Sequence, residues 1–329
     1  MSKRRLSDQQ KSRIAEKQQK EYSAAENTSS IQEAKCNGRV VSHFGQQLDV
    51  EILTGRNAGT LIRCHQRANL PSLVTGDLVL WEEDAGETGV IIAQSERKNV
   101  FGRADKKGQF KPVAANLDCV LIVFAVVPEA FLNLMDRYLV AISQLGLAPV
   151  LVLNKVDLLE AQRNEEIDNM LSIYRNLGYP LYEVSALAGT GLEALEHQLI
   201  GKTTVLVGQS GVGKSSLINK LGFDGLAEVG GLSDSKYKGT HTTTTSRLFH
   251  LHRFDLVDSP GIREFNLGQM GIDEVLNGFI ELKEHSSKCK FRDCGHNLEP
   301  GCAIQAAIAT GEIHRERFES YKRILVSMQ

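Results

Sequence analysis

The segment GQSGVGKSS, Gly208–Ser216, has residue types and spacing that suit the binding of a phosphate chain. Its glycines let successive backbone N–H groups converge on anionic oxygens, and the helix that follows adds its positive end. Lys214 would reach the terminal phosphates, and Ser215 would bind Mg²⁺. The predicted phosphate site comprises Gly208, Gln209, Ser210, Gly211, Val212, Gly213, Lys214, Ser215 and Ser216.

The tetrapeptide NKVD, Asn154–Asp157, suits the recognition of guanine. The Asp157 carboxylate could accept hydrogen bonds from the N1 and N2 donors of guanine, a pair that adenine lacks. The Asn154 amide would tie this loop to the base and the phosphate loop, and the Lys155 stem would lie over the ring. SALAGTG follows the next predicted strand, and its backbone N–H groups could meet guanine O6. The predicted base site comprises Asn154, Lys155, Val156, Asp157, Ser185 and Ala186.

DSPG, Asp258–Gly261, has the form of an element that senses a γ-phosphate. Asp258 would hold Mg²⁺ through water, and Gly261 would respond to the phosphate. Between this element and the phosphate loop lies the polar segment KGTHTTTTS, in which we favour Thr243 as the second Mg²⁺ ligand, with Thr242 as the alternative.

A glutamine that orients the attacking water commonly follows such an element, but the residue after Gly261 is Ile262. We therefore expect slow intrinsic hydrolysis and take His241 as the candidate catalytic residue. The alternative is that His241 is an ordinary surface histidine in a polar loop.

The segment CKFRDCGHNLEPGC carries Cys289, Cys294, His296 and Cys302. Three thiolates and one imidazole in this spacing predict one closed, tetrahedral, structural Zn²⁺ site, with a redox cluster as the alternative. The neighbouring basic and aromatic side chains could contact RNA or protein, or form a solvated rim.

In the usual GTPase order the base-reading loop follows the phosphate loop, but here it precedes it. The set of motifs is the same, and only the point at which the chain starts differs. Because sheet contacts do not depend on where the chain begins, the order predicts a circularly permuted GTPase domain. From Leu117 onward, apolar strand-like and helical segments alternate, which is typical of a doubly wound, mostly parallel α/β sheet. A last amphipathic helix is expected near 303–326.

The chain as a whole divides into five predicted parts. Residues 1–35 form a basic tail, and 36–96 contain about five short strands that predict an OB-fold barrel. Residues 97–116 form a basic linker in which Phe101 and Phe110 are interleaved with Lys and Arg, a mixture that suits RNA or a solvated connection. The GTPase domain spans 117–272, and a mainly helical zinc-binding domain spans 273–329.

The bulk composition narrows the choice of function. With 38 basic and 40 acidic side chains the chain is nearly neutral, so a nucleic acid would be met by local patches. No apolar run is long enough to span a bilayer and no signal peptide is recognisable, so we expect a cytoplasmic protein. We also expect a monomer that does not bind membranes.

These motifs, together with AANLD at Ala114–Asp118, PEAFLNLMDRYLV at Pro128–Val140 and KGTHTTT at Lys238–Thr244, closely resemble the RsgA (YjeQ) family of GTPases. The resemblance implies a GTP hydrolase that is stimulated by the small (30S) ribosomal subunit and acts late in its maturation. It implies an OB-fold that contacts 16S rRNA and a role in releasing other assembly factors. It also implies a hydrophobic residue in place of the catalytic glutamine and a catalytic histidine in the threonine-rich segment, which Ile262 and His241 match.

Two other functions compete with this interpretation. A membrane-surface switch would use the basic tail on anionic lipid, although neither end carries a lipidation motif. A zinc-stabilised RNA-binding scaffold would use the nucleotide only for structure. Stimulation of GTP hydrolysis by small subunits separates the three.

Overall fold

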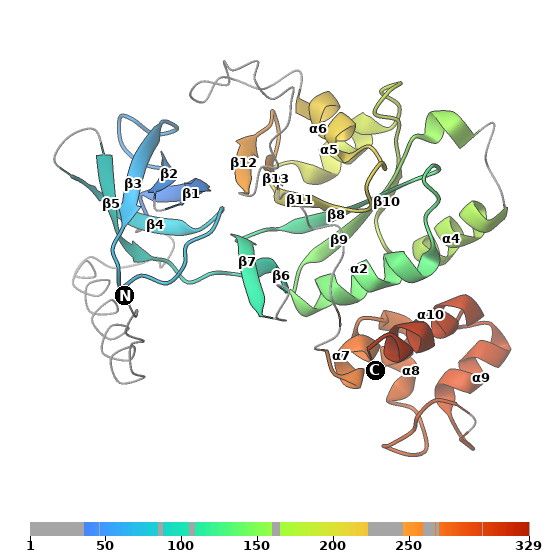
Figure 1. Ribbon diagram of the computed structural model, residues 1–329. Coiled ribbons are helices and arrows are strands. Elements are labelled where there is room, and N and C mark those ends of the chain that lie inside the picture. The colour runs from blue at the N-terminus through green and yellow to red at the C-terminus, as the bar shows by residue number, and fades with distance from the viewer. Residues whose placement is uncertain are drawn as a thin grey trace. The chain divides into compact units, whose positions relative to one another are not determined.

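The structure is a computed structural model of the 329-residue chain, shown in Figure 1. It describes residues 36–45, 47–84, 88–104, 109–159, 165–222, 246–258, 267, 270–297 and 299–328. Two compact units are present in this part of the chain. One runs to Lys98 and includes Ser246 and Arg247, and the other contains the remaining residues from Asn99.

The first unit is built on a five-stranded barrel. Its strands are β1 (Gly38–Phe44), β2 (Gln47–Ile52), β3 (Leu61–Gln66), β4 (Leu78–Glu83) and β5 (Thr88–Gln94). They pair in the order β1-β2-β3-β5-β4, and β4 returns to pair with β1. Only β3 and β5 are parallel to each other within this order. This closed arrangement is an OB-fold, as the strand pattern predicts.

The end of the barrel is fixed by a buried carboxylate. Asp77 is fully buried and accepts hydrogen bonds from Arg97 at 2.7 Å and from the backbone N–H of Val74. Arg97 also donates to the Ser72 carbonyl. This arginine, counted above among the basic residues of the linker, is therefore a structural partner of the barrel.

The predicted linker also contains regular structure. Strands β6 (Val100–Ala104) and β7 (Phe110–Ala115) form an antiparallel two-stranded sheet. Phe101 is fully buried, so its ring cannot stack on an RNA base, whereas Phe110 is exposed. Of the two aromatic side chains considered for stacking, only Phe110 is accessible.

The second unit contains the predicted parallel sheet. Its strands are β8 (Cys119–Ala125), β9 (Ala148–Asn154), β10 (Leu181–Glu183), β11 (Thr203–Val207), β12 (Arg247–His250) and β13 (Asp255–Asp258). The order is β10-β9-β8-β11-β13-β12, and the first five of these strands run parallel. Strands β8 and β11 are buried throughout, as expected for a sheet covered on both faces.

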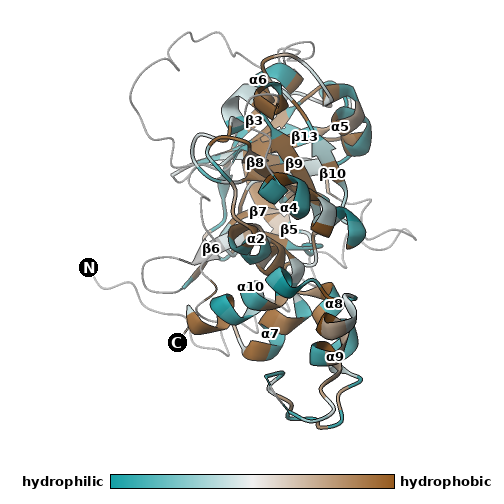
Figure 2. Ribbon diagram, turned by 90° about the vertical axis from the view of Figure 1, so that its right-hand side faces the viewer, coloured by the Kyte–Doolittle hydropathy of each residue, from teal (hydrophilic) through white to brown (hydrophobic). Residues whose placement is uncertain are grey.

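Helices cover this sheet on both faces, as Figures 1 and 2 show. They are α2 (Leu132–Gln144), α4 (Glu165–Asn176), α5 (Leu192–Leu199) and α6 (Lys214–Gly222). Residues of α5 and α6 pack on the face of β8 that carries Leu121 and Val123. The alternation of strand and helix in the sequence therefore correctly predicts an α/β domain.

Four helices complete the second unit. They are α7 (Ile272–Asn277), α8 (Ile280–Ser286), α9 (Ala303–Thr310) and α10 (Arg315–Val326). The expectation of one helix near 303–326 is wrong, because Gly311 ends α9 in the left-handed conformation, with φ +81°. A glycine adopts this conformation without steric cost and so terminates helices.

Helix α2 belongs to the sheet domain but also completes the core of the C-terminal helices. Val140 and Ala141 of α2 pack with Phe279, Phe318 and other residues of these helices. A Cβ on Gly278 would lie 2.7 Å from the Cα of Val140, so the backbone approaches α2 too closely for a side chain. None of the helices in the described ranges has the length and apolar composition that a bilayer crossing requires.

Candidate nucleotide and metal sites

The phosphate loop lies between β11 and α6, and its conformation depends on glycine. Gly208, Gly211 and Gly213 have positive φ angles. A Cβ on Gly208 would lie 2.0 Å from the Val123 carbonyl oxygen of the neighbouring strand β8. The loop therefore has to be glycine where it turns from the sheet into the helix. Ser215 and Ser216 lie exposed in the first turn of α6.

Lys214 begins α6 and bends over the phosphate loop. Its ammonium donates hydrogen bonds to the carbonyl oxygens of Gly208 at 2.7 Å and Gln209 at 2.6 Å. The positive charge is therefore held directly above the backbone of the loop, where phosphate oxygens could replace the carbonyl oxygens as its partners.

The NKVD loop contacts the phosphate loop directly. The buried Asn154 amide donates to the Val212 carbonyl oxygen at 2.9 Å, and its oxygen accepts from the backbone N–H of Ala186 at 3.1 Å. Lys155 donates from Nζ to the Gly211 carbonyl oxygen at 2.7 Å. One asparagine and one lysine therefore join three loops at the carboxyl ends of three parallel strands.

Close packing reinforces the Asn154 contact. Gly213 has φ +92°, and a Cβ there would lie 2.4 Å from Nδ2 of Asn154. The buried asparagine therefore fits only against a glycine in the phosphate loop.

Asp157 is exposed at the edge of this cluster and is held from one side. It accepts a hydrogen bond from the hydroxyl of Ser185, which in turn accepts one from the backbone N–H of Ala188 at 2.9 Å. Ser185 is fully buried, so this contact fixes the direction of the carboxylate. Val156 lies beside it in a short 3-10 helix, Val156–Leu158, that begins after Lys155.

Sequence reasoning missed one part of this cluster, the loop between β8 and α2. The Val127 carbonyl oxygen accepts a second hydrogen bond from Lys155 Nζ, at 2.6 Å. A Cβ on Gly211 would lie 3.7 Å from Cδ of Pro128. The available signal was the position of Val127 and Pro128 just after a buried strand, where loops of a parallel sheet gather.

The predicted Mg²⁺ and hydrolytic residues are only partly described. Asp258 ends β13 with an exposed side chain, next to β11 in the sheet order. Thr242, Thr243, His241, Gly261 and Ile262 lie outside the described residues.

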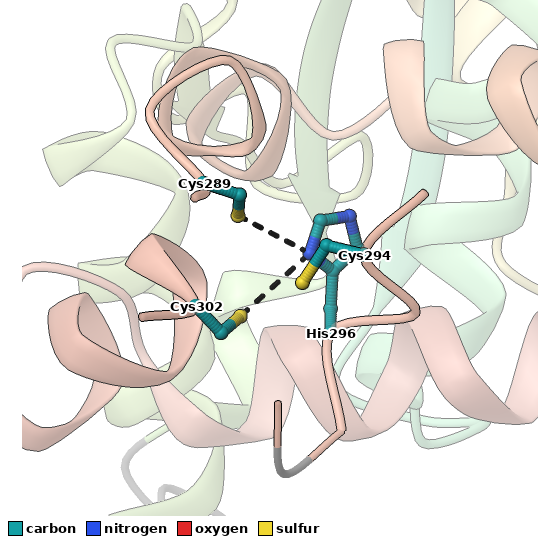
Figure 3. Close-up of side chains that lie close together, drawn as sticks. All are labelled: Cys289, Cys294, His296 and Cys302. Atoms are coloured by element: carbon teal, nitrogen blue, oxygen red, sulfur yellow. Dashed lines mark hydrogen bonds between the residues drawn. The ribbon is translucent and has the colours of Figure 1, made fainter. Parts of the chain in front are cut away.

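The four predicted zinc ligands lie together in the segment between α8 and α9, as Figure 3 shows. Their ligand atoms all lie within 4.8 Å of one another. His296 Nδ1 is 3.6 Å from Cys289 Sγ and 3.7 Å from Cys302 Sγ. A tetrahedral Zn²⁺ with ordinary Zn–S and Zn–N distances places such atoms about 3.6 Å apart. Both the donor set and the spacing therefore fit a closed zinc site.

The backbone around this cluster is held by Glu299. Its carboxylate accepts hydrogen bonds from the backbone N–H groups of Gly295 at 2.9 Å and Asn297 at 2.7 Å. These two residues flank His296, whose left-handed backbone, φ +60°, is unusual for a residue other than glycine. Glu299 therefore fixes the turn that presents the imidazole.

The protonation of the ligands suits a metal in different ways. Burial lowers the pKa of His296, so the imidazole is neutral at neutral pH and its Nδ1 lone pair can bind a metal. Partial burial and the neighbouring Cys302 and Cys289 thiols raise the pKa of Cys294 to about 11 without an ion. Binding a metal at neutral pH would therefore release a proton from this thiol.

An α/β sheet with a phosphate loop, an NKVD loop that precedes it in the chain, an OB-fold barrel and a Cys3His cluster define a circularly permuted P-loop GTPase. Comparison with known proteins agrees. A family model described as RsgA GTPase matches residues 94–268.

Two curated relatives and two solved structures are similar along most of their length. "Small ribosomal subunit biogenesis GTPase RsgA" of Pseudomonas fluorescens (strain SBW25) is 48% identical over 338 residues, covering 100% of this chain and 98% of the relative. The protein of the same name from Ectopseudomonas mendocina (strain ymp) is 52% identical over 294 residues, covering 88% and 85%. The crystal structure of YjeQ from Thermotoga maritima has a TM-score of 0.71 and 30% identity, covering 88% of this chain and 97% of that one. YloQ, described as a circularly permuted GTPase, has a TM-score of 0.72 and 27% identity, covering 92% and 97%.

The chain therefore belongs to the RsgA GTPase family, and its enzymatic activity is the hydrolysis of GTP. The resemblance drawn from the sequence motifs is confirmed.

Proposed function

We propose that this GTPase binds guanine nucleotide between the phosphate loop, the NKVD loop and the loop at Ser185. The observation that carries this proposal is the direct contact of the NKVD and phosphate loops through Asn154 and Lys155. Asp157 reads the base, Ala186 shifts its backbone N–H from Asn154 Oδ1 to guanine O6, and Lys214 binds the terminal phosphates.

Hydrolysis in this proposal uses residues of the phosphate loop, the threonine-rich segment KGTHTTTTS and the DSPG element. Ser215 and Thr243 bind Mg²⁺ directly, and Asp258 holds it through water. Bound there, Mg²⁺ neutralises charge on the phosphates. Gly261 responds to the γ-phosphate, and His241 orients the attacking water because Ile262 cannot.

The Cys3His cluster holds one structural Zn²⁺ in this proposal. All four ligands come from the protein and no coordination position is left for a substrate. Its role is to fix the loops between α8 and α9 and so to shape the C-terminal helices.

The proposed cellular role follows from the names of the relatives, which are small ribosomal subunit biogenesis GTPases. We infer that this chain binds the small subunit, contacts 16S rRNA in part through its OB-fold barrel, and assists late maturation. Hydrolysis is slow alone and stimulated by the subunit. A measurement of GTP turnover with and without purified small subunits tests this: strong stimulation supports it, and no stimulation favours a scaffold that uses nucleotide only for structure.

Nucleotide selectivity tests the base site. Asp157→Asn should weaken GTP binding and improve xanthosine triphosphate binding, because xanthine presents an oxygen where guanine has its amino group. Asp168→Asn, the same substitution at an exposed position of α4, is the matched control. Unchanged guanine preference in Asp157→Asn would contradict the proposed site.

The nucleotide state should be relayed to the zinc-binding helices, because the DSPG segment directly precedes them in the chain. Hydrogen exchange of α7–α10 should differ between GDP and a non-hydrolysable GTP analogue. Identical hydrogen-exchange protection in the two nucleotide states would contradict this proposal.

A further inference from the structure

An arginine is fully enclosed where the zinc-binding helices meet the GTPase domain. Arg317 of α10 is 1% exposed. Its guanidinium donates to Glu281 of α8 at 2.7 and 3.1 Å and to Asp136 of α2. The hydroxyl of Tyr174, from α4, donates to the same Asp136 oxygen at 2.6 Å. The cluster therefore joins two helices of the GTPase domain to two of the zinc-binding helices.

The surroundings of the guanidinium hold it in one place. It lies 4.4 Å from the ring centroid of Phe279 and 5.7 Å from that of Tyr174. A buried charge is costly unless it is paired, so any displacement of α10 relative to α2 would separate charges within a medium of low dielectric constant. Such a cluster specifies one docking geometry.

A second contact fixes the first turn of α2 to the same helix. Asn133 donates from Nδ2 to the carbonyl oxygen of Ser320 at 3.1 Å and to its hydroxyl at 3.0 Å. The hydroxyl of Tyr174 lies 3.2 Å from the carbonyl oxygen of Leu132, the first residue of α2. Helix α10 therefore holds the end of α2 that follows the loop after β8.

That loop meets the nucleotide site. Val127 accepts the hydrogen bond from Lys155 Nζ, and Pro128 lies against Gly211 of the phosphate loop. Lys155 shares its ammonium between Val127 and Gly211. The position of α2 therefore determines where the Val127 carbonyl oxygen, one of the two partners of Lys155, lies.

We propose that Arg317, although it lies in the zinc-binding helices, is a positioning residue for the nucleotide pocket. By holding Asp136 and the first turn of α2, it keeps the Val127 carbonyl in place for Lys155. Nucleotide affinity in this GTPase then depends on the docking of the zinc-binding helices. The inference rests on the nucleotide site proposed above.

The test compares zinc-loaded, folded variants of the full chain. Arg317→Met should weaken GDP binding about 5- to 20-fold, within the range of coupling between distant sites. Arg317→Lys, which keeps the charge, should restore most of the affinity, and Asn133→Ala should lose about 2- to 5-fold. The matched control is Arg323→Met, because Arg323 is exposed on α10 and its described hydrogen bond stays within that helix.

The form of the loss separates positioning from general damage. Because Lys155 lies on the base side of the pocket, GDP and a non-hydrolysable GTP analogue should lose affinity by the same factor. The KM for GTP should rise while kcat at saturating GTP stays near that of the parent protein.

Three outcomes decide the inference. If Arg317→Met and Asn133→Ala keep their zinc and fold and bind GDP as tightly as the parent, Arg317 has only a structural role and the inference is wrong. If Arg317→Met does not fold, Asn133→Ala gives the decision by the same criterion. If instead Asp157→Asn leaves guanine selectivity unchanged, the proposed nucleotide site itself is wrong. If Asp157→Asn changes the selectivity as expected but Arg317→Met binds GDP like the parent, only the inference about Arg317 is wrong.

Discussion

The nucleotide pocket and the interface between α2 and the zinc-binding helices are held together by opposite means. In the pocket, side chains of Asn154, Lys155 and Lys214 bond to backbone carbonyl oxygens at the ends of strands. At the interface, a buried arginine is bonded to two carboxylates from different helices. The pocket is thus a set of backbone loops joined by polar side chains, and the interface is a set of side chains that fix whole helices.

This difference predicts different consequences of mutation. Loops at the rim of a sheet can lose a contact while the sheet remains folded, because the sheet core does not depend on them. Buried charges without partners act against the folded state itself. Changes in the pocket should therefore mainly reduce binding, and changes in the zinc-binding helices or at their interface should mainly reduce stability, in addition to the loss of GDP affinity proposed for Arg317.

The largest effect is expected from loss of zinc. Cys302→Ser removes a ligand that directly precedes α9, and should abolish stoichiometric zinc binding. Structural zinc provides about 10–16 kcal/mol in isolated zinc-finger peptides, so the loss here should be several kcal/mol. Metal analysis and thermal unfolding measure it. Cys36→Ser, at the start of the barrel, is the control and should keep its zinc. A Cys302→Ser protein of parental stability would contradict a structural role for the metal.

The next largest effect concerns Arg317. Arg317→Met leaves Asp136 and Glu281 buried without their cation, and should cost about 3–5 kcal/mol of unfolding free energy. Asp136→Asn should cost much less, because Arg317 keeps Glu281. Replacing all three residues with apolar side chains of similar volume should recover most of the loss. Urea unfolding measures each value, and a triple variant as unstable as Arg317→Met would show that the loss does not come from uncompensated buried charge.

The same contrast explains which parts of the structure could be predicted from the sequence. The phosphate loop, NKVD and the zinc ligands each lie in one short segment whose spacing fixes their geometry, and the structure brings the described members of each together. Asp136, Tyr174, Glu281 and Arg317 are spread over 182 positions, from 136 to 317, and form no motif. Their partnership arises from helix packing, which one sequence does not reveal.

Local breaks in regular structure were also difficult to predict. An amphipathic pattern continues across Gly311, but only the left-handed backbone there shows that α9 and α10 are separate. By composition Arg97 is part of a basic stretch, but in the structure it forms an ion pair with Asp77. The core of the zinc-binding helices includes Val140 of α2, which lies far away in the sequence, so no local pattern predicts this packing.

A smaller effect tests the pocket side of the comparison. Gly213→Ala places a Cβ 2.4 Å from Nδ2 of Asn154, whereas Gly146→Ala, also at positive φ, has no atom within 4 Å. Both variants place an alanine at positive φ, so Gly146→Ala controls for a substitution in that backbone conformation. Overpacking costs about 1–3 kcal/mol, which here should appear as a roughly 5- to 150-fold loss of GDP affinity. The unfolding free energies of the two variants should be similar. If Gly213→Ala binds GDP as tightly as Gly146→Ala, the contact between Gly213 and Asn154 does not contribute to nucleotide binding.

The smallest effect concerns the pH dependence of the interface. Burial raises the pKa of Asp136, and the Arg317 charge only partly opposes this effect. Between the ordinary aspartate pKa and the raised one, the folded protein holds a proton that the unfolded chain has released. The contribution of Asp136 to the unfolding free energy therefore falls as pH rises through this window, by at most about 1.4 kcal/mol per pH unit.

Asp136→Asn removes the titrating group and should flatten this part of the pH profile. Relative to the parent protein, the variant should gain stability as the pH rises above the ordinary aspartate pKa. Urea unfolding of both zinc-loaded proteins across a pH series measures the difference between their unfolding free energies. The titration of other groups contributes equally to both proteins and cancels in this difference. Parallel profiles would show that Arg317 compensates fully for the burial of Asp136. The interface would then be held by an ion pair across the whole pH range.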